Sequence, residues 1–539
     1  SVIIIHEHQP LSRENGVVIW LSIPLLFGLH IVRSMTDLIH PDVAWYLYGT
    51  GRLLHGAKLY HDIVDINPPL VYLLHMPPVW LAGVLGISAT AVFKGLMLVL
   101  VAVVLVICSR LLVLLSGSFS TSSRRFILLI LTFLFVSVAA GNFGYLGSSF
   151  GQREHMMMLL ATPYLLGAIA QASGVQISRR QRWMVALMAG IGISLKPHFI
   201  LMWLAVEGCV FFVGPNRNGW KRLENVVIAV MLACYWALVA AVFPEYFQVS
   251  AAVMQVYGVY DATLWVLLTQ QAVVLWVVAV VFLLMQRSRL LRNRATLLFF
   301  VAGTAFLLVA LLQRKGWGYQ SYPARVAILL SLAIALNAWF DVRKTSERFA
   351  WFTAERLRTL ITILMLVAAA KPAVDSFRRP VPGLVPALLP IVKQHAQGRS
   401  ILVLSTALDP QFPLVVYGGV SWSSRYPQLW FVPGFYEGVL NEKDGRFPYH
   451  DPSSMSALER QFFEDVITDV ITNPPELLLN NIGGDRYPMG KSSFNFLDYY
   501  SMDQRFSELF QQYRLIKTVD NFTAYKRQPI DLSLTLNQH

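Results

Sequence analysis

The chain has 539 residues, of which 55% are hydrophobic and only 14% are charged, and its mean hydropathy is +0.52. Soluble domains usually carry about 25% charged residues, so this composition excludes an ordinary soluble protein. Apolar runs long enough to cross a bilayer recur between residues 17 and 370 and indicate a polytopic membrane protein. The net charge of +13 would suggest nucleic-acid binding in a soluble chain. Here most basic residues lie in short breaks between apolar runs, where they set orientation, so we predict no nucleic-acid partner.

The apolar runs predict about eleven transmembrane helices. They lie near 17–33, 90–116, 126–141, 155–173, 183–196, 198–214, 225–243, 263–285, 295–312, 323–340 and 357–371. Clusters of arginine and lysine fall in every second loop between these helices. Because basic loops stay in the cytoplasm, this pattern places the N-terminus inside.

The segment 68–88 is apolar but is interrupted by two pairs of prolines, and counting it as a span would invert the later basic loops. We therefore predict an interfacial helix on the outer face. The outer loops are then 34–89, 142–154, 244–262, 313–322 and everything after about residue 371. Few charges remain on this side of the helical region, and charges at a membrane boundary suggest a functional site.

The tail is polar and rich in proline, and it mixes two kinds of pattern. Short β-like runs occur at 401–406, 413–419, 476–481 and 513–519, and they alternate with helical stretches at 454–471 and 501–512. This alternation predicts a small α/β domain. We therefore expect a transmembrane catalytic domain over 1–370, with the outer-face loop 34–89, and a periplasmic α/β domain over 371–539.

The first outer loop carries a carboxylate among aromatic residues. Pro41 can start a helix and Gly56 can end it. Between them, Asp42, Trp45 and Tyr46 share one face at helical spacing. The carboxylate would thus lie on a short helix near the membrane plane. The alternative is an ordinary acidic residue that complements the helix dipole.

The second candidate is Gly-Gln-Arg-Glu-His at 151–155, where an apolar helix begins. Glu154 would lie near Asp42 as a second acidic group. Two facing carboxylates can share a divalent metal, with His155 as a third ligand, or one can raise the pKa of the other so that it acts as a base. The alternative is a helix-dipole carboxylate paired with Arg153. Metal dependence therefore stays open, and no other cofactor is predicted.

The third candidate is the segment 313–323, in which Arg314 and Lys315 stand next to glycines and aromatics such as Trp317. Lys196 supplies another cation at an outer turn. Cations on this side suit a phosphate or an anionic headgroup, and the alternative is snorkelling to anionic lipid. Together the candidates suit a reaction between a lipid phosphate and a hydroxyl acceptor. A carboxylate would take the acceptor's proton, and cations would stabilise the departing phosphate.

These motifs resemble those of membrane glycosyltransferases of the GT-C class. The resemblance rests on Pro41-Asp42 after the first helix, Asn-Pro-Pro-Leu-x-Tyr at 67–72, an acid in the second outer loop, and Lys-Gly…Tyr…Pro at 315–323. The pattern is similar to the bacterial lipid A aminoarabinose transferases and the protein O-mannosyltransferases. It covers residues 17 to about 340 and implies a GT-C-like helical bundle.

By this resemblance, Asp42 is the catalytic base and Glu154 the second-loop acid. Lys315 and Tyr322 would face the donor phosphate. The full set of phosphate-binding candidates is Lys315, Arg314, Lys196, Tyr322 and Arg153. The substrate-lining candidates are Trp45, Tyr46, Asn67, Tyr72, His155 and Trp317. Two positions depart from the pattern: Val43 stands where relatives often have a second acid, and Asn67 where aminoarabinose transferases have lysine.

The resemblance implies transfer of a sugar from a polyprenyl-phosphate donor to a hydroxyl acceptor, which could be a lipid, a polysaccharide or a lipopolysaccharide-type glycan. The expected place is the outer face of a bacterial inner membrane, among membrane lipids. One alternative is a transporter or flippase for polyprenyl-linked glycans, which should carry polar groups near the bilayer midplane. Another is an O-antigen-ligase-like transferase, which typically has a large polar loop between late helices. The mostly apolar helix centres and the C-terminal position of the large polar region favour the first interpretation.

Overall fold

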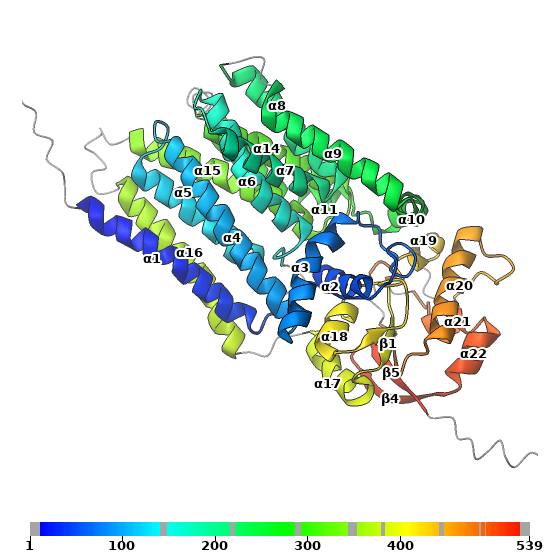
Figure 1. The fold of residues 1–539 in the computed structure, drawn as a ribbon. Helices are drawn as coiled ribbons and strands as arrows, with labels where there is room; N and C mark the ends of the chain where they lie inside the picture. The colour runs from blue at the N-terminus through cyan, green and yellow to red at the C-terminus, as the bar shows by residue number, and fades with distance from the viewer. Residues whose placement is uncertain are drawn as a thin grey trace, which may run out of the picture. The chain divides into compact units, whose positions relative to one another are not determined.

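The computed structural model is mostly helical, with one small sheet (Figure 1). It describes residues 11–140, 148–215, 221–285, 293–342, 353–378, 383–440, 447–483, 487–490 and 492–528. Contacts divide the chain into two compact units. The first, called the helical unit, comprises Ser1–Leu38, Lys94–Ala237 and Ala262–Val381. The second, called the mixed unit, comprises Ile39–Phe93, Leu238–Asp261 and Pro382–His539.

Helices occur at all eleven predicted stretches. They are α1 (Leu11–Ser34), α4 (Ala89–Leu114), α5 (Thr121–Phe133) with the π-helical turn η1 (Leu134–Val138), α6 (Arg153–Ala172), α7 (Arg179–Ser194), η3 (Pro197–Phe199) with α8 (Ile200–Val213), α9 (Leu223–Val242), α11 (Leu264–Leu268) with α12 (Gln271–Met285), α14 (Arg294–Leu312), η6 (Gly318–Ser321) with α15 (Tyr322–Val342), and α16 (Ala354–Arg378). The single helix predicted over 263–285 is two helices, separated at residues 269–270.

Seven of the described helices are long and apolar enough to cross a membrane, and shorter apolar helices accompany them. The seven are Ala89–Leu114, Thr121–Val138, Arg153–Ala172, Leu223–Val242, Arg294–Leu312, Gly318–Trp339 and Ala354–Ser376. Helix α6 is the most enclosed of them, because 94% of its apolar window is buried, against 28% for α9 and α16. Apolar surface on an outer helix suits contact with lipid, whereas α6 belongs to the core of the bundle. The exact number of spans stays a prediction.

The helical unit is packed closely and joined by ion pairs. A Cβ at Gly303 of α14 would lie 2.7 Å from Ile328 of α15, so this glycine allows close approach of the two helices. Arg182 of α7 donates to both carboxylate oxygens of Glu224 in α9, at 2.9 and 2.8 Å. Buried charges need such partners. Basic residues that the sequence assigned to topology therefore also connect helices.

The mixed unit combines most of the predicted outer loop 34–89 with residues 238–261 and the C-terminal region. Its helices and strands are α2 (Pro41–Leu54), α3 (Leu70–Leu85), α10 (Glu245–Val256), η5 (Tyr257–Tyr260), α17 (Leu384–Ala396), β1 (Ser400–Leu404), α18 (Gln411–Gly418), β2 (Ser421–Trp422), α19 (Val432–Phe435), α20 (Ala457–Thr472), β3 (Leu477–Asn481), α21 (Phe496–Tyr500), α22 (Gln504–Phe510), β4 (Tyr513–Val519) and β5 (Phe522–Arg527). The predicted boundary near residue 370 stays a prediction.

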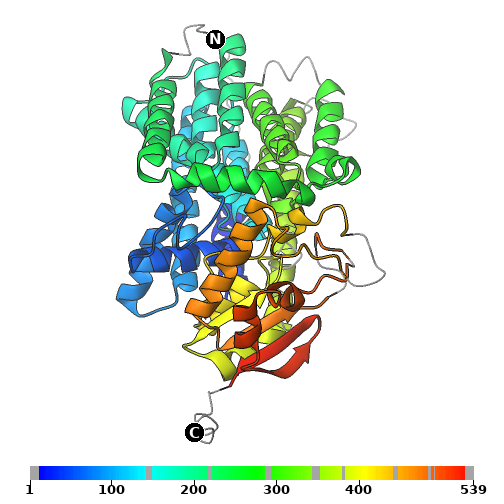
Figure 2. The same ribbon diagram turned by 90° about the vertical axis from the view of Figure 1, so that its right-hand side faces the viewer.

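The five strands form one mixed sheet in the order β2-β1-β3-β5-β4. Strand β1 is parallel to β2 and β3, with Ile401 opposite Leu477, whereas β5 is antiparallel to both β3 and β4. Figure 2 shows the last two strands, in red, side by side at the edge of the sheet. Strands β1 and β3 are almost entirely buried and form the core of this region.

Three predicted strands are confirmed as β1, β3 and β4, and two predicted helices as α20 and α22. The strand predicted over 413–419 is wrong, because these residues belong to α18 and its C-terminal turn. A short apolar run has no periodicity that separates a buried strand from a buried helix. The helix ends at Gly419, whose φ of 63° is the left-handed conformation that favours glycine.

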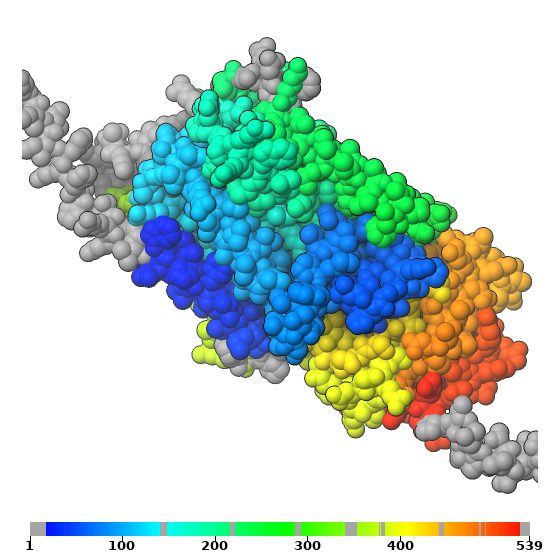
Figure 3. Space-filling model, in the orientation of Figure 1, coloured from blue at the N-terminus to red at the C-terminus, as the bar shows by residue number. Residues whose placement is uncertain are grey.

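Helix α3 is the helix predicted over 68–88, and it contains Pro77 and Pro78. Its exposed apolar side chains include Trp80, Val84 and Leu85. Figure 3 shows this part of the chain, in blue, at the molecular surface. Such a surface suits the membrane interface. The interfacial position itself stays a prediction.

Candidate active site

Asp42 lies in the first turn of α2, which begins at Pro41. The Nδ1 atom of His40 accepts a hydrogen bond from the backbone N–H of Asp42 at 3.2 Å and so caps the helix. The side chain of Asp42 is 22% exposed, although most residues that follow it in α2 are buried. A carboxylate here lies at the end of the helix where the dipole stabilises negative charge. The helix thus presents an accessible, negatively charged group, as a base requires.

A second carboxylate, Asp65, organises the same loop from inside. Its side chain is buried and accepts hydrogen bonds from Trp45 Nε1 (3.0 Å), Tyr72 Oη (2.5 Å) and Asn67 Nδ2 (2.8 Å). Three residues predicted to line the substrate therefore share one structural partner. The sequence analysis did not single out Asp65; the available signal was Asp-x-Asn before Pro-Pro, a pattern that favours an Asx turn.

Tyr46, also a predicted substrate-lining residue, is buried in the mixed unit. Its ring packs edge-to-face against Tyr72, with centroids 5.7 Å apart, and lies 5.4 Å from the ring of His75. Such contacts are typical of an aromatic core. Tyr46 therefore supports α2 and α3 in this structure.

Replacing Asp65 by asparagine is expected to destabilise the mixed unit by about 1–3 kcal/mol. Both carboxylate oxygens of Asp65 accept hydrogen bonds. The amide nitrogen of asparagine cannot accept one, so it would face the donors of one oxygen without bonding to them. The measurement is the thermal unfolding midpoint of the purified full chain in detergent. A midpoint equal to that of the wild type would contradict the anchoring role.

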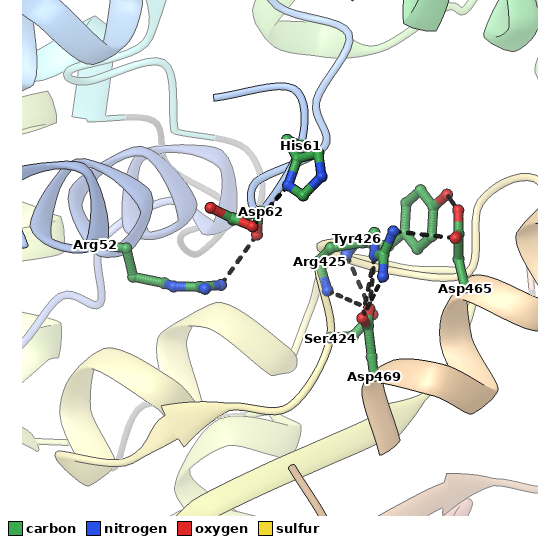
Figure 4. A network of polar contacts seen from close by, with 8 residues as sticks. All are labelled: Arg52, His61, Asp62, Ser424, Arg425, Tyr426, Asp465 and Asp469. Atoms are coloured by element: carbon green, nitrogen blue, oxygen red, sulfur yellow. Dashed lines mark hydrogen bonds and ion pairs between the residues drawn. The ribbon is translucent and has the colours of Figure 1, made fainter. Parts of the chain in front are cut away.

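Asp62 lies near the surface of the same loop (Figure 4). Its carboxylate accepts from the backbone N–H of Lys58 at 2.8 Å and contacts His61 Nδ1 at 2.8 Å, while Arg52 donates to its backbone carbonyl at 3.1 Å. The Lys58 N–H holds the pKa of Asp62 below its usual range. Asp62 thus closes the turn between α2 and α3 as an ionised group.

In the helical unit, Lys196 joins three loops that the sequence placed on the outer face. Its Nζ donates to Glu154 Oε1 at 2.5 Å and to Gln313 Oε1 at 3.0 Å, and it lies 5.8 Å from the ring centroid of Tyr319. Glu154 is in the first turn of α6, Lys196 follows α7, and Gln313 follows α14. The sequence analysis gave Glu154 and Lys196 separate roles and did not single out Gln313. The structure joins all three.

The carboxylate of Glu154 is fully buried, and its second oxygen, Oε2, has no hydrogen-bond donor among the described residues. A buried carboxylate is costly unless a cation compensates it. Lys196 supplies that charge, and it is itself largely buried. Glu154 is therefore first of all the partner of Lys196.

The cationic segment after α14 is held in an unusual conformation. Arg314 has a φ of 56° although it is not glycine, and Gly316 has a φ of 70°. The carbonyl of Arg314 accepts from the N–H of Ala262 at 2.7 Å. Left-handed conformations at non-glycine residues store strain and are often found at functional sites. This conformation fixes the backbone that carries Arg314 and Lys315, and the rings of Trp317 and Tyr319 stack beside it, 6.1 Å apart.

Arg325 is a further cation that the sequence analysis did not assign. It lies in the first turn of α15 and donates to the carbonyl of Gly318 at 3.1 Å. Its place two residues after the Tyr322-Pro323 motif was the available signal. Arg325 adds a positive charge next to the segment 313–322.

The polar side-chain atoms of His155 and Tyr322 form hydrogen bonds with backbone groups. His155 Nδ1 accepts from the N–H of Gly151 at 3.1 Å, and its Nε2 donates to the carbonyl of Phe135 at 2.9 Å. Tyr322 donates to the carbonyl of Leu134 at 3.0 Å. Both side chains are fully buried, and each donates a hydrogen bond to a backbone carbonyl of the π-helical turn η1. We therefore leave both out of the proposed site.

The predicted metal ligands do not form a site within either unit. No group of three or more His, Cys, Asp or Glu side chains in the described part of the chain is arranged to hold a metal ion. Asp42 belongs to the mixed unit, whereas Glu154 and His155 belong to the helical unit. Because both nitrogens of His155 are hydrogen-bonded, this residue would have to lose a bond to become a ligand. No step below uses a metal.

Several solved structures are similar to this chain. No protein-family model and no curated protein matches the sequence. The archaeal oligosaccharyltransferase AglB from Archaeoglobus fulgidus, solved in complex with an inhibitory peptide and a dolichol-phosphate, is similar to this chain with a TM-score of 0.44 and 10% sequence identity. The similarity covers 97% of this chain and 75% of that one.

Proposed function

We propose that this chain is a membrane glycosyltransferase that moves a sugar from a polyprenyl-phosphate donor to a hydroxyl acceptor. The observation that carries the proposal is the Lys196 cluster, defined as Lys196, Glu154 and Gln313 with the nearby cations Arg314, Lys315 and Arg325. It includes four cations, Lys196, Arg314, Lys315 and Arg325, which lie at or near the ends of the apolar helices α7, α14 and α15. Positive charge at such a place suits a lipid phosphate.

In the proposed reaction, the acceptor hydroxyl attacks the anomeric carbon of the donor sugar. The bond between that carbon and the phosphate oxygen breaks, and polyprenyl phosphate leaves with its negative charge. Asp42 takes the proton of the attacking hydroxyl. Arg314, Lys315 and Lys196 stabilise the charge on the leaving phosphate. Such electrostatic stabilisation by positioned groups is often the largest contribution to lowering the activation barrier.

The acceptor is a lipid, a polysaccharide or a lipopolysaccharide-type glycan, and the reaction takes place on the outer face of a bacterial inner membrane. The exposed apolar side chains of α3 support the placement of the Asp42 loop at a membrane surface, because they suit an interfacial helix.

Mass spectrometry of glycolipids and polysaccharides from cells with and without this protein tests the proposed function. We expect one monosaccharide to disappear from an envelope glycan while its polyprenyl-phosphate form accumulates. Identical glycan profiles in the two strains would contradict a transferase. Loss of a complete glycan from the outer side, with its lipid-linked form unchanged in composition, would indicate a transporter instead.

Replacing Lys315 by alanine is expected to raise the KM for the donor more than the KM for the acceptor. The reason is the loss of one cation near the donor phosphate, and the effect should shrink as salt screens the remaining charge. The measurement is steady-state kinetics in proteoliposomes at two ionic strengths. Lys517→Ala, at an exposed position in β4, is the matched control. A change confined to the acceptor KM would contradict the phosphate role.

A further inference from the structure

The helix that carries Asp42 is held by the C-terminal region of the same compact unit. Immediately before α2, the N–H of Ile39 donates to the hydroxyl oxygen of Tyr417 in α18 at 2.9 Å. Within α2, the hydroxyl oxygen of Tyr48 accepts from the N–H of Trp422 in β2 at 2.8 Å. These two bonds fix the start and the middle of the helix to residues nearly 380 positions away in sequence.

An aromatic cluster fills the space between the same elements. The ring of Phe412 in α18 lies 4.6 Å from that of Trp45, 5.8 Å from that of Tyr48 and 5.1 Å from that of Trp422, measured between centroids. Phe412 and Trp45 are buried. Interlocked aromatic rings resist small displacements, because each ring is surrounded on several sides.

The loop that follows α2 is attached in the same way. The N–H of Val64 donates to the carbonyl of Arg425 at 2.9 Å. Arg425 is itself fixed on α20, because its side chain donates to Asp469 at 2.8 Å and to Asp465 at 3.0 Å, and its N–H donates to Asp469 at 2.8 Å (Figure 4). A bidentate arginine with two carboxylates is a rigid support. Hydrogen bonds therefore connect α2 and the residues beside it to α18 and β2, and through Arg425 to α20.

We propose that Tyr417 and Tyr48 are positioning residues, which hold the first turn of α2 against the C-terminal region so that Asp42 is set for proton transfer. The inference rests on the proposed function of Asp42. It gives the C-terminal region a role in the reaction without contact with the reacting atoms. The hydroxyl groups act on backbone N–H groups, so their removal loosens the helix without changing the chemistry of Asp42.

The consequence for catalysis is a loss of turnover and not of donor affinity. A displacement of about 1 Å at a catalytic group can lower a rate about 10²-fold. Donor binding is assigned to cations of the helical unit, whereas the bonds of Tyr417 and Tyr48 to backbone N–H groups lie within the mixed unit. A split between kcat and KM is therefore the signature of positioning.

The test compares Tyr417→Phe, Tyr48→Phe and the double variant in the full-length protein, reconstituted in proteoliposomes. Tyr513→Phe is the matched control, because the Tyr513 hydroxyl is also bonded to a backbone group but lies in the sheet; it donates to the carbonyl of Pro475 at 2.6 Å. We expect kcat to fall about 10-fold or more in the double variant, with the donor KM unchanged. Hydrogen exchange in the peptide that covers residues 39–48 should become faster, and Tyr513→Phe should change neither quantity.

Wild-type kcat in the double variant, when Asp42→Asn is inactive, would overturn the positioning role. An equal loss in Tyr513→Phe would also overturn it, since general destabilisation would then explain the effect. Absence of transfer by the wild-type protein would overturn the proposed function instead. In that case the hydrogen-exchange measurement still decides whether Tyr417 and Tyr48 hold α2, because it needs no substrate.

Discussion

Replacing Asp42 by asparagine is expected to lower kcat for sugar transfer by about 10²–10⁴-fold, the usual contribution of a general base. Asparagine has the shape of aspartate but does not accept the acceptor's proton at neutral pH. The cap on α2 should survive, because His40 accepts from the backbone N–H of residue 42 and not from its side chain. The unfolding midpoint and the donor KM should therefore stay close to wild-type values.

The matched control for this variant is Asp62→Asn. Asp62 lies in the same loop, is more exposed than Asp42, and has its own partners in Lys58 and His61. We expect Asp62→Asn to retain turnover. Measurement of polyprenyl phosphate release by both variants separates the two aspartates. Undiminished release by Asp42→Asn, or an equal loss in both variants, would remove Asp42 from the mechanism.

The second large effect is expected on stability. Replacing Lys196 by methionine leaves the buried carboxylate of Glu154 without its cation, and breaking a buried ion pair in this way costs about 3–5 kcal/mol. Adding Glu154→Gln removes the uncompensated charge, so the double variant should regain much of the lost stability. The measurement is thermal unfolding of the purified protein in detergent, compared among the two single variants and the double variant.

Lys371→Met provides the control for burial. Lys371 pairs with Asp375 at 2.8 Å, but its side chain is 78% exposed, and exposed pairs contribute only about 0–1 kcal/mol. A similar shift of the unfolding midpoint for Lys196→Met and Lys371→Met would show that burial does not increase the contribution of the Lys196 ion pair to stability. Turnover of the double variant adds a second result: full activity would show that neither side chain takes part in the chemistry, whereas a lasting loss at regained stability would support the role of Lys196 at the donor phosphate.

The helices could be predicted from the sequence because membrane spans are long, apolar and separated by basic loops. This holds even for α3, where the prolines affected the expected placement but not the helix itself. The strand predicted over 413–419 failed for the opposite reason. Its apolar run is short and buried, and only the contacts of α18 with Trp45 and Tyr48 determine its conformation.

The membership of the candidate site was easier to predict than its contacts. Local patterns singled out Asp42, Glu154 and Lys196, because each is a polar residue where an apolar helix begins or ends. The pairing of Glu154 with Lys196 joins residues 42 positions apart, and the bond of Tyr48 to Trp422 spans 374 positions. No local pattern encodes such contacts, which depend on how helices and strands pack.

The most direct test of the central claim is the stoichiometry of the reaction in proteoliposomes that contain only the purified protein, a polyprenyl-phosphate sugar and a hydroxyl acceptor. Mass spectrometry counts the polyprenyl phosphate released and the sugar joined to the acceptor. The proposed function predicts equal amounts of both products with the wild-type protein and a large loss of both with Asp42→Asn. Movement of intact donor across the bilayer, without release of polyprenyl phosphate, would contradict it.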